Sequence, residues 1–313
     1  MATESPTAIF LALGANALIA LSKFAAAAFT GSGAMLAEAI HSLADCANQL
    51  LLLVGMRHAK EPSSELHPLG NGRVSYFYSM IVALMLFFIG GVFSAYEGVH
   101  RLAHHEPLSY PYVAIAVLLV SLVLEGISLS GALKQIRRRN PTKSIWRWFR
   151  ETRQSELLVV TGEDTAALLG LAIAFIAIVA STLTGNPVYD AWGSIGVGLV
   201  LMLVAGLVLR EVQSMIIGES AAPETRREIQ AFLTARPEIR NLISLITLQW
   251  GQHIIVAVQA EMIDYPSGRA QVDAINLIET ALQQRFPAAR WVFFEPDVAS
   301  AADQHDAMPT RSP

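Results

Sequence analysis

The sequence is poor in charged residues and in cysteine. Only 15% of its 313 residues are charged, against about 25% in soluble domains, and its Lys and Arg residues form no basic stripe. The single cysteine, Cys46, excludes an intrachain disulfide and a cluster of thiolate metal ligands. With a net charge of −4, the composition excludes nucleic-acid binding as a leading hypothesis, because that function requires clustered Lys and Arg.

Apolar residues, by contrast, make up 53% of the chain and are concentrated before residue 210. A helix needs about 20 apolar residues to cross the hydrocarbon core of a membrane. Backbone groups in lipid must be satisfied within the segment, so such runs form helices. The first 218 residues therefore predict a transmembrane domain of six helices, over residues 8–30, 33–56, 75–99, 111–134, 157–184 and 188–210.

The connectors between these segments alternate in basic content. The second connector holds Arg57, Lys60 and Arg73, and the fourth is rich in Lys and Arg, whereas the first and fifth hold neither and the third holds only Arg101. Basic residues accumulate in cytoplasmic loops. Both chain termini are therefore predicted to lie in the cytoplasm.

From residue 219 the composition becomes that of a soluble domain. Its periodicity predicts helices at 223–235 and 269–285 and strands at 242–249, 254–263 and 290–295. This αββαβ order predicts a small cytosolic α/β domain over residues 219–297. The remaining residues, 298–313, are rich in Ala, Asp and Pro and are predicted to be disordered.

The second apolar segment carries a stripe of polar residues. Glu38, His41, Asp45 and Asn48 are spaced three and four apart, so all four lie on one face of a helix. Ionisable residues in a spanning segment cost about 2.5–3.5 kcal/mol each, which makes them functional candidates. An imidazole and a carboxylate at this spacing can both reach one zinc ion.

Two donors do not complete a zinc site, and the fifth segment supplies Glu163 and Asp164. The remaining candidates are Lys23, Glu97, Glu125 and Asp190. Glu97 and Asp190 fall near segment ends, where water is close, whereas Lys23 and Glu125 are deeper and can equally be structural partners of buried polar groups.

Two alternatives to transport remain open from these residues. The polar stripe can serve only to pack helices in a membrane protein that binds a partner. A membrane-embedded metalloenzyme is the second, although the sequence shows no HExxH-like motif and no obvious nucleophile.

The run "AEAIHSLADCANQ" at Ala37–Gln49 resembles the second-helix metal motif of the cation diffusion facilitator family. "HPLGNGR" at His67–Arg73, "YDAWGSIGVGLVL" at Tyr189–Leu201 and "IIGESAAPE" at Ile216–Glu224 agree with that family in order and spacing. The run "GEDTAALLG" at Gly162–Gly170 resembles the branch that includes the animal mitochondrial zinc transporter.

The resemblance implies a homodimeric metal/proton antiporter without a cofactor, which is not an enzyme. It would export zinc or another divalent cation from the cytoplasm through a bilayer, here expected to be a bacterial inner membrane. His41, Asp45 and Asp164 would be ligands, Glu163 a fourth ligand or proton carrier, and Asn48 a further oxygen donor. One departure is that Val160 stands where most members carry a fifth-helix ligand.

The cytosolic domain of such proteins often carries a further metal cluster. This domain offers only His253, with Glu295 and Asp297 near the last strand. A role in dimerisation is therefore the preferred expectation for the domain.

Overall fold

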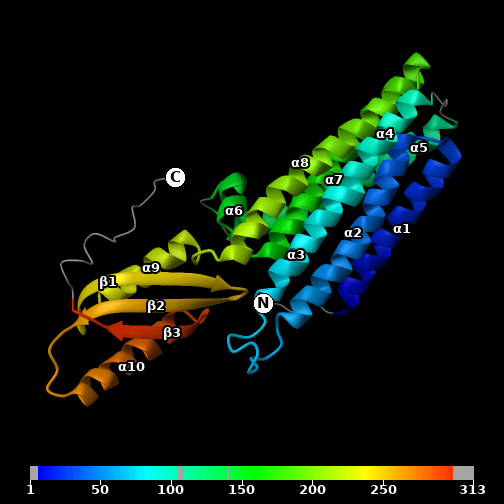
Figure 1. Cartoon of the computed structure of the whole chain (residues 1–313). Helices are drawn as coiled ribbons and strands as arrows, with labels where there is room; N and C mark the ends of the chain where they lie inside the picture. Colours follow the sequence, from blue (N-terminus) through cyan, green and yellow to red (C-terminus); the bar gives the residue numbers. More distant parts are fainter. Residues whose placement is uncertain (1–5, 105–108, 140, 142, 299–313) are drawn as a thin grey trace. The chain divides into compact units, whose positions relative to one another are not determined.

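The computed structural model describes residues 6–104, 109–139, 141 and 143–298. These residues form two compact units, which divide between Ser214 and Met215. The first unit is helical and the second is an α/β unit (Figure 1). The predicted fold class, apolar helices followed by a small α/β unit, is confirmed. The tail predicted to be disordered lies outside the described residues, apart from Val298.

The helical unit consists of long helices joined by short connectors. Their bounds are α1 (Pro6–Thr30), α2 (Gly33–His58), α5 (Pro111–Arg139), α7 (Ser155–Thr184) and α8 (Val188–Ile217), with α3 (Val74–Met85), η1 (Leu86–Val92) and α4 (Phe93–Ala103) following one another without a break. A short helix that the sequence analysis did not predict, α6 (Ile145–Glu151), interrupts the basic fourth connector. Ser144 caps this helix by accepting a hydrogen bond from the backbone N–H of Arg147 at 3.2 Å.

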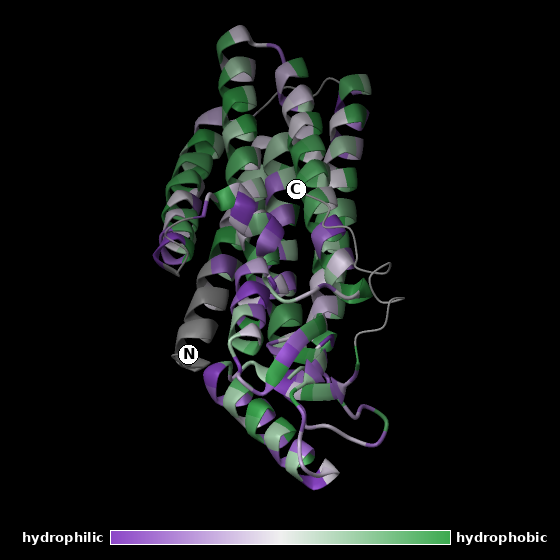
Figure 2. Ribbon diagram, turned by 90° about the vertical axis from the view of Figure 1, so that its left-hand side faces the viewer, coloured by the Kyte–Doolittle hydropathy of each residue, from purple (hydrophilic) through white to green (hydrophobic). Residues whose placement is uncertain are grey.

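Five helical segments among the described residues are long and apolar enough to cross a membrane, namely Gly33–His58, Val74–Ala103, Pro111–Arg138, Ser155–Thr184 and Val188–Ile217. Within α1 the segment Asn16–Thr30 is apolar but shorter. Hydrophobic residues cover most of these helices, whereas hydrophilic residues are frequent in the α/β unit (Figure 2).

The third spanning segment changes its hydrogen-bonding register at η1, a π-helical stretch. π-Helical turns inside α-helices are rare and frequently occur at functional sites. Two glycines let this segment approach α8 closely. A Cβ at Gly91 would meet Met202, and one at Gly98 would meet the backbone at Ala191 and Ile195. Small residues at such crossings allow helix backbones in a membrane to pack directly.

The start of α2 is fixed by a buried acid from α8. Asp190 is 2% exposed, and it accepts hydrogen bonds from the hydroxyl of Ser32 at 2.6 Å and from the backbone N–H of Gly33 at 2.8 Å. These contacts satisfy a backbone donor that the first turn of a helix leaves free. The polar stripe of α2 therefore begins from a firmly positioned helix end.

The α/β unit contains α9 (Pro223–Thr234), β1 (Ile239–Trp250), β2 (His253–Met262), α10 (Gly268–Arg285) and β3 (Ala289–Pro296), in the predicted αββαβ order. The sheet has the order β1-β2-β3, with β1 antiparallel and β3 parallel to β2. Alternate residues of β2 are buried, and they share a core with Ile229 of α9 and Ile278 of α10.

Candidate metal centre

The polar stripe of α2 faces the inside of the helical unit. Glu38, His41 and Asn48 are fully buried, and the side chain of Asp45 is 14% exposed. The spacing of three and four residues places them on one face, as the sequence analysis predicted. Each must therefore find a partner among the neighbouring helices or face a cavity.

Glu163 reaches from α7 to this stripe. The side-chain amide of Asn48 donates to Glu163 Oε1 at 2.9 Å. The carboxyl groups of Asp45 and Glu163 line one cavity and lie near each other. Two carboxyl groups at that separation repel unless a proton or a cation lies between them. This pair is therefore a place where a proton and a metal ion can replace each other.

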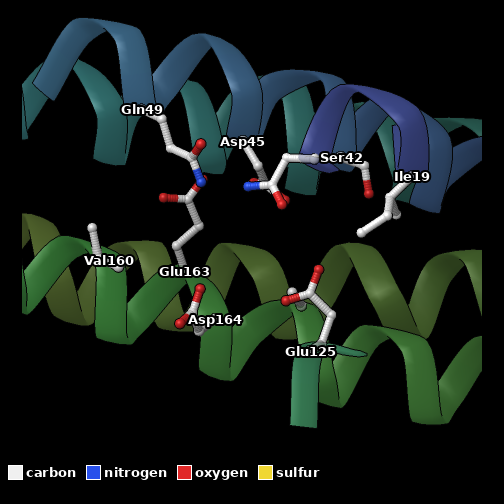
Figure 3. A pocket seen from close by; sticks show the side chains of 10 residues that line it. Ile19, Ser42, Asp45, Gln49, Glu125, Val160, Glu163 and Asp164 are labelled. Carbon is white, nitrogen blue, oxygen red and sulfur yellow. The ribbon is translucent and has the colours of Figure 1, made fainter. Parts of the chain in front are cut away.

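A small cavity opens between α2 and α7 beside this pair (Figure 3). It contains about 30 Å³ of water-accessible space, and about 10–15 Å³ suffices for one water molecule. The cavity can therefore admit one small ion. Its lining residues are Asn16, Ile19, Ser42, Asp45, Gln49, Glu125, Val160, Glu163, Asp164 and Ala167.

Glu163 and Asp164 are adjacent in the chain, but their side chains approach two different helices, α2 and α5. Glu163 contacts the α2 stripe, whereas Asp164, which also lines the cavity, lies near Ser128 of α5. Adjacent residues on a helix point about 100° apart, so their side chains approach the cavity from different sides. Val160 also lines the cavity, and its apolar side chain supplies no donor there.

His41 lies beside Asp45 and is not one of the residues that line the cavity. Its Nδ1 is 3.5 Å from Asp45 Oδ1, and a Cβ at Gly90 of η1 would be 3.6 Å from the same nitrogen. Both ring nitrogens are buried without a hydrogen-bond partner. Within the described residues, no three His, Cys, Asp or Glu side chains are arranged to hold one metal ion.

The other charged residues considered from the sequence have separate roles. Lys23 of α1 is fully buried and donates to Glu38 Oε2 at 3.3 Å and to Ser42 Oγ at 2.7 Å. Glu97 pairs with Arg101 at 2.7 Å near the end of α4. Lys23 and Glu97 therefore each belong to a structural ion pair, Lys23 with Glu38 and Glu97 with Arg101. Glu125 of α5, by contrast, lines the cavity.

Sequence reasoning missed three polar residues of the cavity wall: Asn16, Ser42 and Gln49. Ser42 and Gln49 flank the stripe on α2, and Figure 3 shows both pointing toward the cavity. The helical wheel contains a signal for Gln49, which lies four residues after Asp45. Asn16 comes from α1, and its place depends on how α1 packs against α2.

The three donors considered in the α/β unit do not converge. His253 stands at the start of β2 beside Trp291, with ring centroids 5.9 Å apart. Glu295 pairs in register with Gln259, whose side-chain amide donates to Asp297 at 2.7 Å. His253 is six residues from Gln259 along β2, which is about 20 Å. His253 therefore lies far from Glu295 and Asp297.

Comparison with known proteins gives consistent matches. Residues 9–217 match the family model described as the cation efflux transmembrane domain. The human mitochondrial proton-coupled zinc antiporter SLC30A9 is 35% identical over 236 residues, which cover 75% of this chain and 42% of the human protein. Metal tolerance protein C4 of Arabidopsis thaliana is 32% identical over 236 residues, covering 74% of this chain and 51% of that protein. The cation-efflux pump FieF of Klebsiella pneumoniae is 28% identical over 288 residues, covering 91% of this chain and 90% of the pump. The chain therefore spans only about half of the length of the first two relatives.

Proposed function

The chain belongs to the cation efflux family, and we propose that it transports a divalent metal cation, preferably zinc, out of the cytoplasm in exchange for protons. The relatives are named as antiporters, pumps and tolerance proteins, and the family is one of membrane transporters rather than enzymes. The alternative of a membrane-embedded metalloenzyme is therefore set aside.

The observation that carries this proposal is the contact of Glu163 with Asp45 and Asn48 beside a cavity inside an apolar helical unit. Carboxyl groups are costly in lipid, and these are joined across two helices. Metal binding requires ionised carboxylates and a neutral imidazole, so a metal that enters displaces protons. The same groups can then carry protons on the return step.

We assign the ligand roles as follows. Asp45 and Asp164 supply oxygen atoms from opposite walls of the cavity, and Glu163 acts as a fourth ligand or as the proton carrier. Asn48 Oδ1, buried and without a partner, is available as a further oxygen donor. His41 completes the set when its side chain rotates, so that a ring nitrogen moves away from Gly90 of η1 and toward the cavity. A mixture of one nitrogen and several oxygens suits zinc and also accommodates other first-row divalent metals.

Zinc uptake into sealed proteoliposomes tests this proposal. Asp45→Asn and Asp164→Asn should each abolish uptake, because each removes a charged donor while keeping the side chain's shape. The matched control is Asp264→Asn, whose carboxylate is 95% exposed in the α/β unit and pairs with Arg240 at 2.9 Å. Uptake by the unsubstituted chain equal to that of empty vesicles would instead favour a protein whose polar stripe only packs helices.

We propose further that both termini and the α/β unit lie in the cytoplasm and that the membrane is a bacterial inner membrane. The alternation of basic connectors supports this orientation, and one relative is a bacterial pump. Single cysteines at positions 138 and 185 in a Cys46→Ser background test it. A reagent confined to the outside should label position 185 and leave position 138 unlabelled, and the reverse pattern would invert the topology.

We also propose that the transporter is a homodimer held partly by the open face of the sheet. Ile246, Ala257 and Phe293 pair side by side across the three strands. They lie on the face away from α9 and α10, and Ile246 is 61% and Phe293 56% exposed. An apolar row of this kind fits a second copy. Phe293→Asp should therefore shift the purified protein toward monomer in sedimentation, and an unchanged dimer would place the interface elsewhere.

A further inference from the structure

Two histidines stand one above the other at the end of α4, far from the cavity. His100 and His104 are both exposed, and their ring centroids are 4.6 Å apart with an interplanar angle of 23°. They are four residues apart, the spacing at which two histidines on one helical face bind a metal together. His100 lies about 15 Å along the helix from Gly90, which adjoins His41.

The ring of His104 is held in a suitable orientation. Its Nδ1 lies 3.2 Å from the backbone carbonyl oxygen of His100. In the tautomer in which Nδ1 donates to that oxygen, the lone pair of Nε2 points outward. Histidines that bind metals commonly donate their other ring N–H to a carbonyl in this way.

The charges around the pair also favour a cation. The pair lies in the last turn of α4 and directly after it, where unpaired backbone carbonyls carry partial negative charge. The neighbouring Arg101 is turned toward other partners, because its guanidinium pairs with Glu97 and donates to the backbone oxygen of Gly31. Its positive charge is thus largely compensated.

We propose that His100 and His104 form a second divalent-cation site, separate from the transport site and open to solvent. The two imidazole nitrogens hold the ion, and water completes its coordination. Such a site follows the order of affinities of nitrogen donors, with Cu²⁺ and Ni²⁺ bound more tightly than Zn²⁺ or Mn²⁺. Only exposed side chains need to turn to bring both nitrogens onto one ion, and such rotations are fast.

The position of this site gives it a place beside the transport route. The contact of Arg101 with Gly31 puts the end of α4 next to the α1–α2 connector. That connector carries no basic residue and is predicted to face away from the cytoplasm. A metal ion released on that side would meet the histidine pair first. This placement rests on the proposed function, whereas metal binding by the pair does not.

Binding of Ni²⁺ to the tag-free, full-length protein tests the site. The measurement uses an Asp45→Asn background, so that the outcome is independent of the proposed transport site. His100→Gln and His104→Gln should each weaken Ni²⁺ binding roughly 10-fold or more, because the second imidazole binds within the same molecule. His67→Gln, which removes an exposed histidine from another connector, should leave binding unchanged.

A second variant tests the geometry while it keeps the number of histidines. In His104→Gln/Val99→His the new ring is next to His100 in the chain, at an exposed position, and points about 100° away from it, so this variant should bind as weakly as His104→Gln alone. The next residues, His105 and Glu106, lie outside the described residues and stay unchanged in every variant. Parent-like Ni²⁺ binding after either single substitution, or full binding in the relocated variant, would overturn the proposal.

Discussion

Lys23→Met should destabilise the helical unit, because it leaves Glu38 charged and unpaired between α1 and α2. Both side chains are fully buried, and Lys23 Nζ lies 3.3 Å from Glu38 Oε2 and 2.7 Å from Ser42 Oγ. Glu38 also packs against α7, since a Cβ at Gly170 would be 2.8 Å from its Oε1. The carboxylate therefore has no open path to water in this packing.

The size of the effect follows from the burial of the pair. Removal of one partner from a buried ion pair costs about 3–5 kcal/mol, whereas replacement of both partners by neutral groups of similar shape is often neutral. The double variant Lys23→Met/Glu38→Gln should therefore recover most of the stability lost in the single variant. The coupling between the two sites is expected to be about 3 kcal/mol.

Unfolding in mixed micelles with an increasing fraction of SDS, followed by circular dichroism, measures these differences. The single variant should also recover part of its stability at lower pH, because a protonated Glu38 carries no charge. A double variant as unstable as the single one, or a single variant as stable as the parent, would refute this reasoning.

Other predictions concern the cavity and the packing around it. Val160→His should tighten zinc binding by roughly 10-fold in calorimetry, because an imidazole fills the missing fifth-helix position. Glu163→Gln should weaken zinc transport or alter its pH dependence, because an amide cannot release a proton. Gly198→Ala should lower the free energy of unfolding by about 1–3 kcal/mol, since its Cβ would lie 2.6 Å from backbone atoms, whereas Gly206→Ala, with nothing within 4 Å, should not. Burial, assisted by a nearby arginine, lowers the pKa of His253, so the proton binds more readily to the unfolded chain. The protection of β2 amides against hydrogen exchange, taken relative to the intrinsic exchange rate at each pH, should therefore fall as the pH drops below about 6.5 but not in His253→Gln.

The spanning helices could be predicted because their length and apolar content are direct consequences of the bilayer. The αββαβ order of elements in the second unit followed from its periodicity in the same way. η1 could not be predicted, because Leu86–Val92 is equally apolar in an α-helical or a π-helical register. α6 was missed although Ser144 is a capping residue, because the charges of its connector were interpreted only as topology signals.

For the candidate site, too, the sequence predicted some features and could not predict others. Spacing alone predicted that the four residues of the α2 stripe share a face. It could not predict that Glu163, rather than its neighbour, contacts Asn48, since that depends on the rotation of α7 about its axis. Nor could it place His41 beside Gly90, because the contact requires η1 to pass close to α2.

Calorimetric titration of zinc into the purified protein, in buffers of different ionisation enthalpy, tests the central claim most directly. The double variant His100→Gln/His104→Gln is used as the parent protein in this titration, so that zinc binding at the proposed surface site does not contribute to the signal. We expect zinc binding near neutral pH to release protons into the buffer, and we expect Asp45→Asn to abolish both the binding and the release. Zinc binding that is unchanged by Asp45→Asn, or that releases no protons in the parent, would contradict the account.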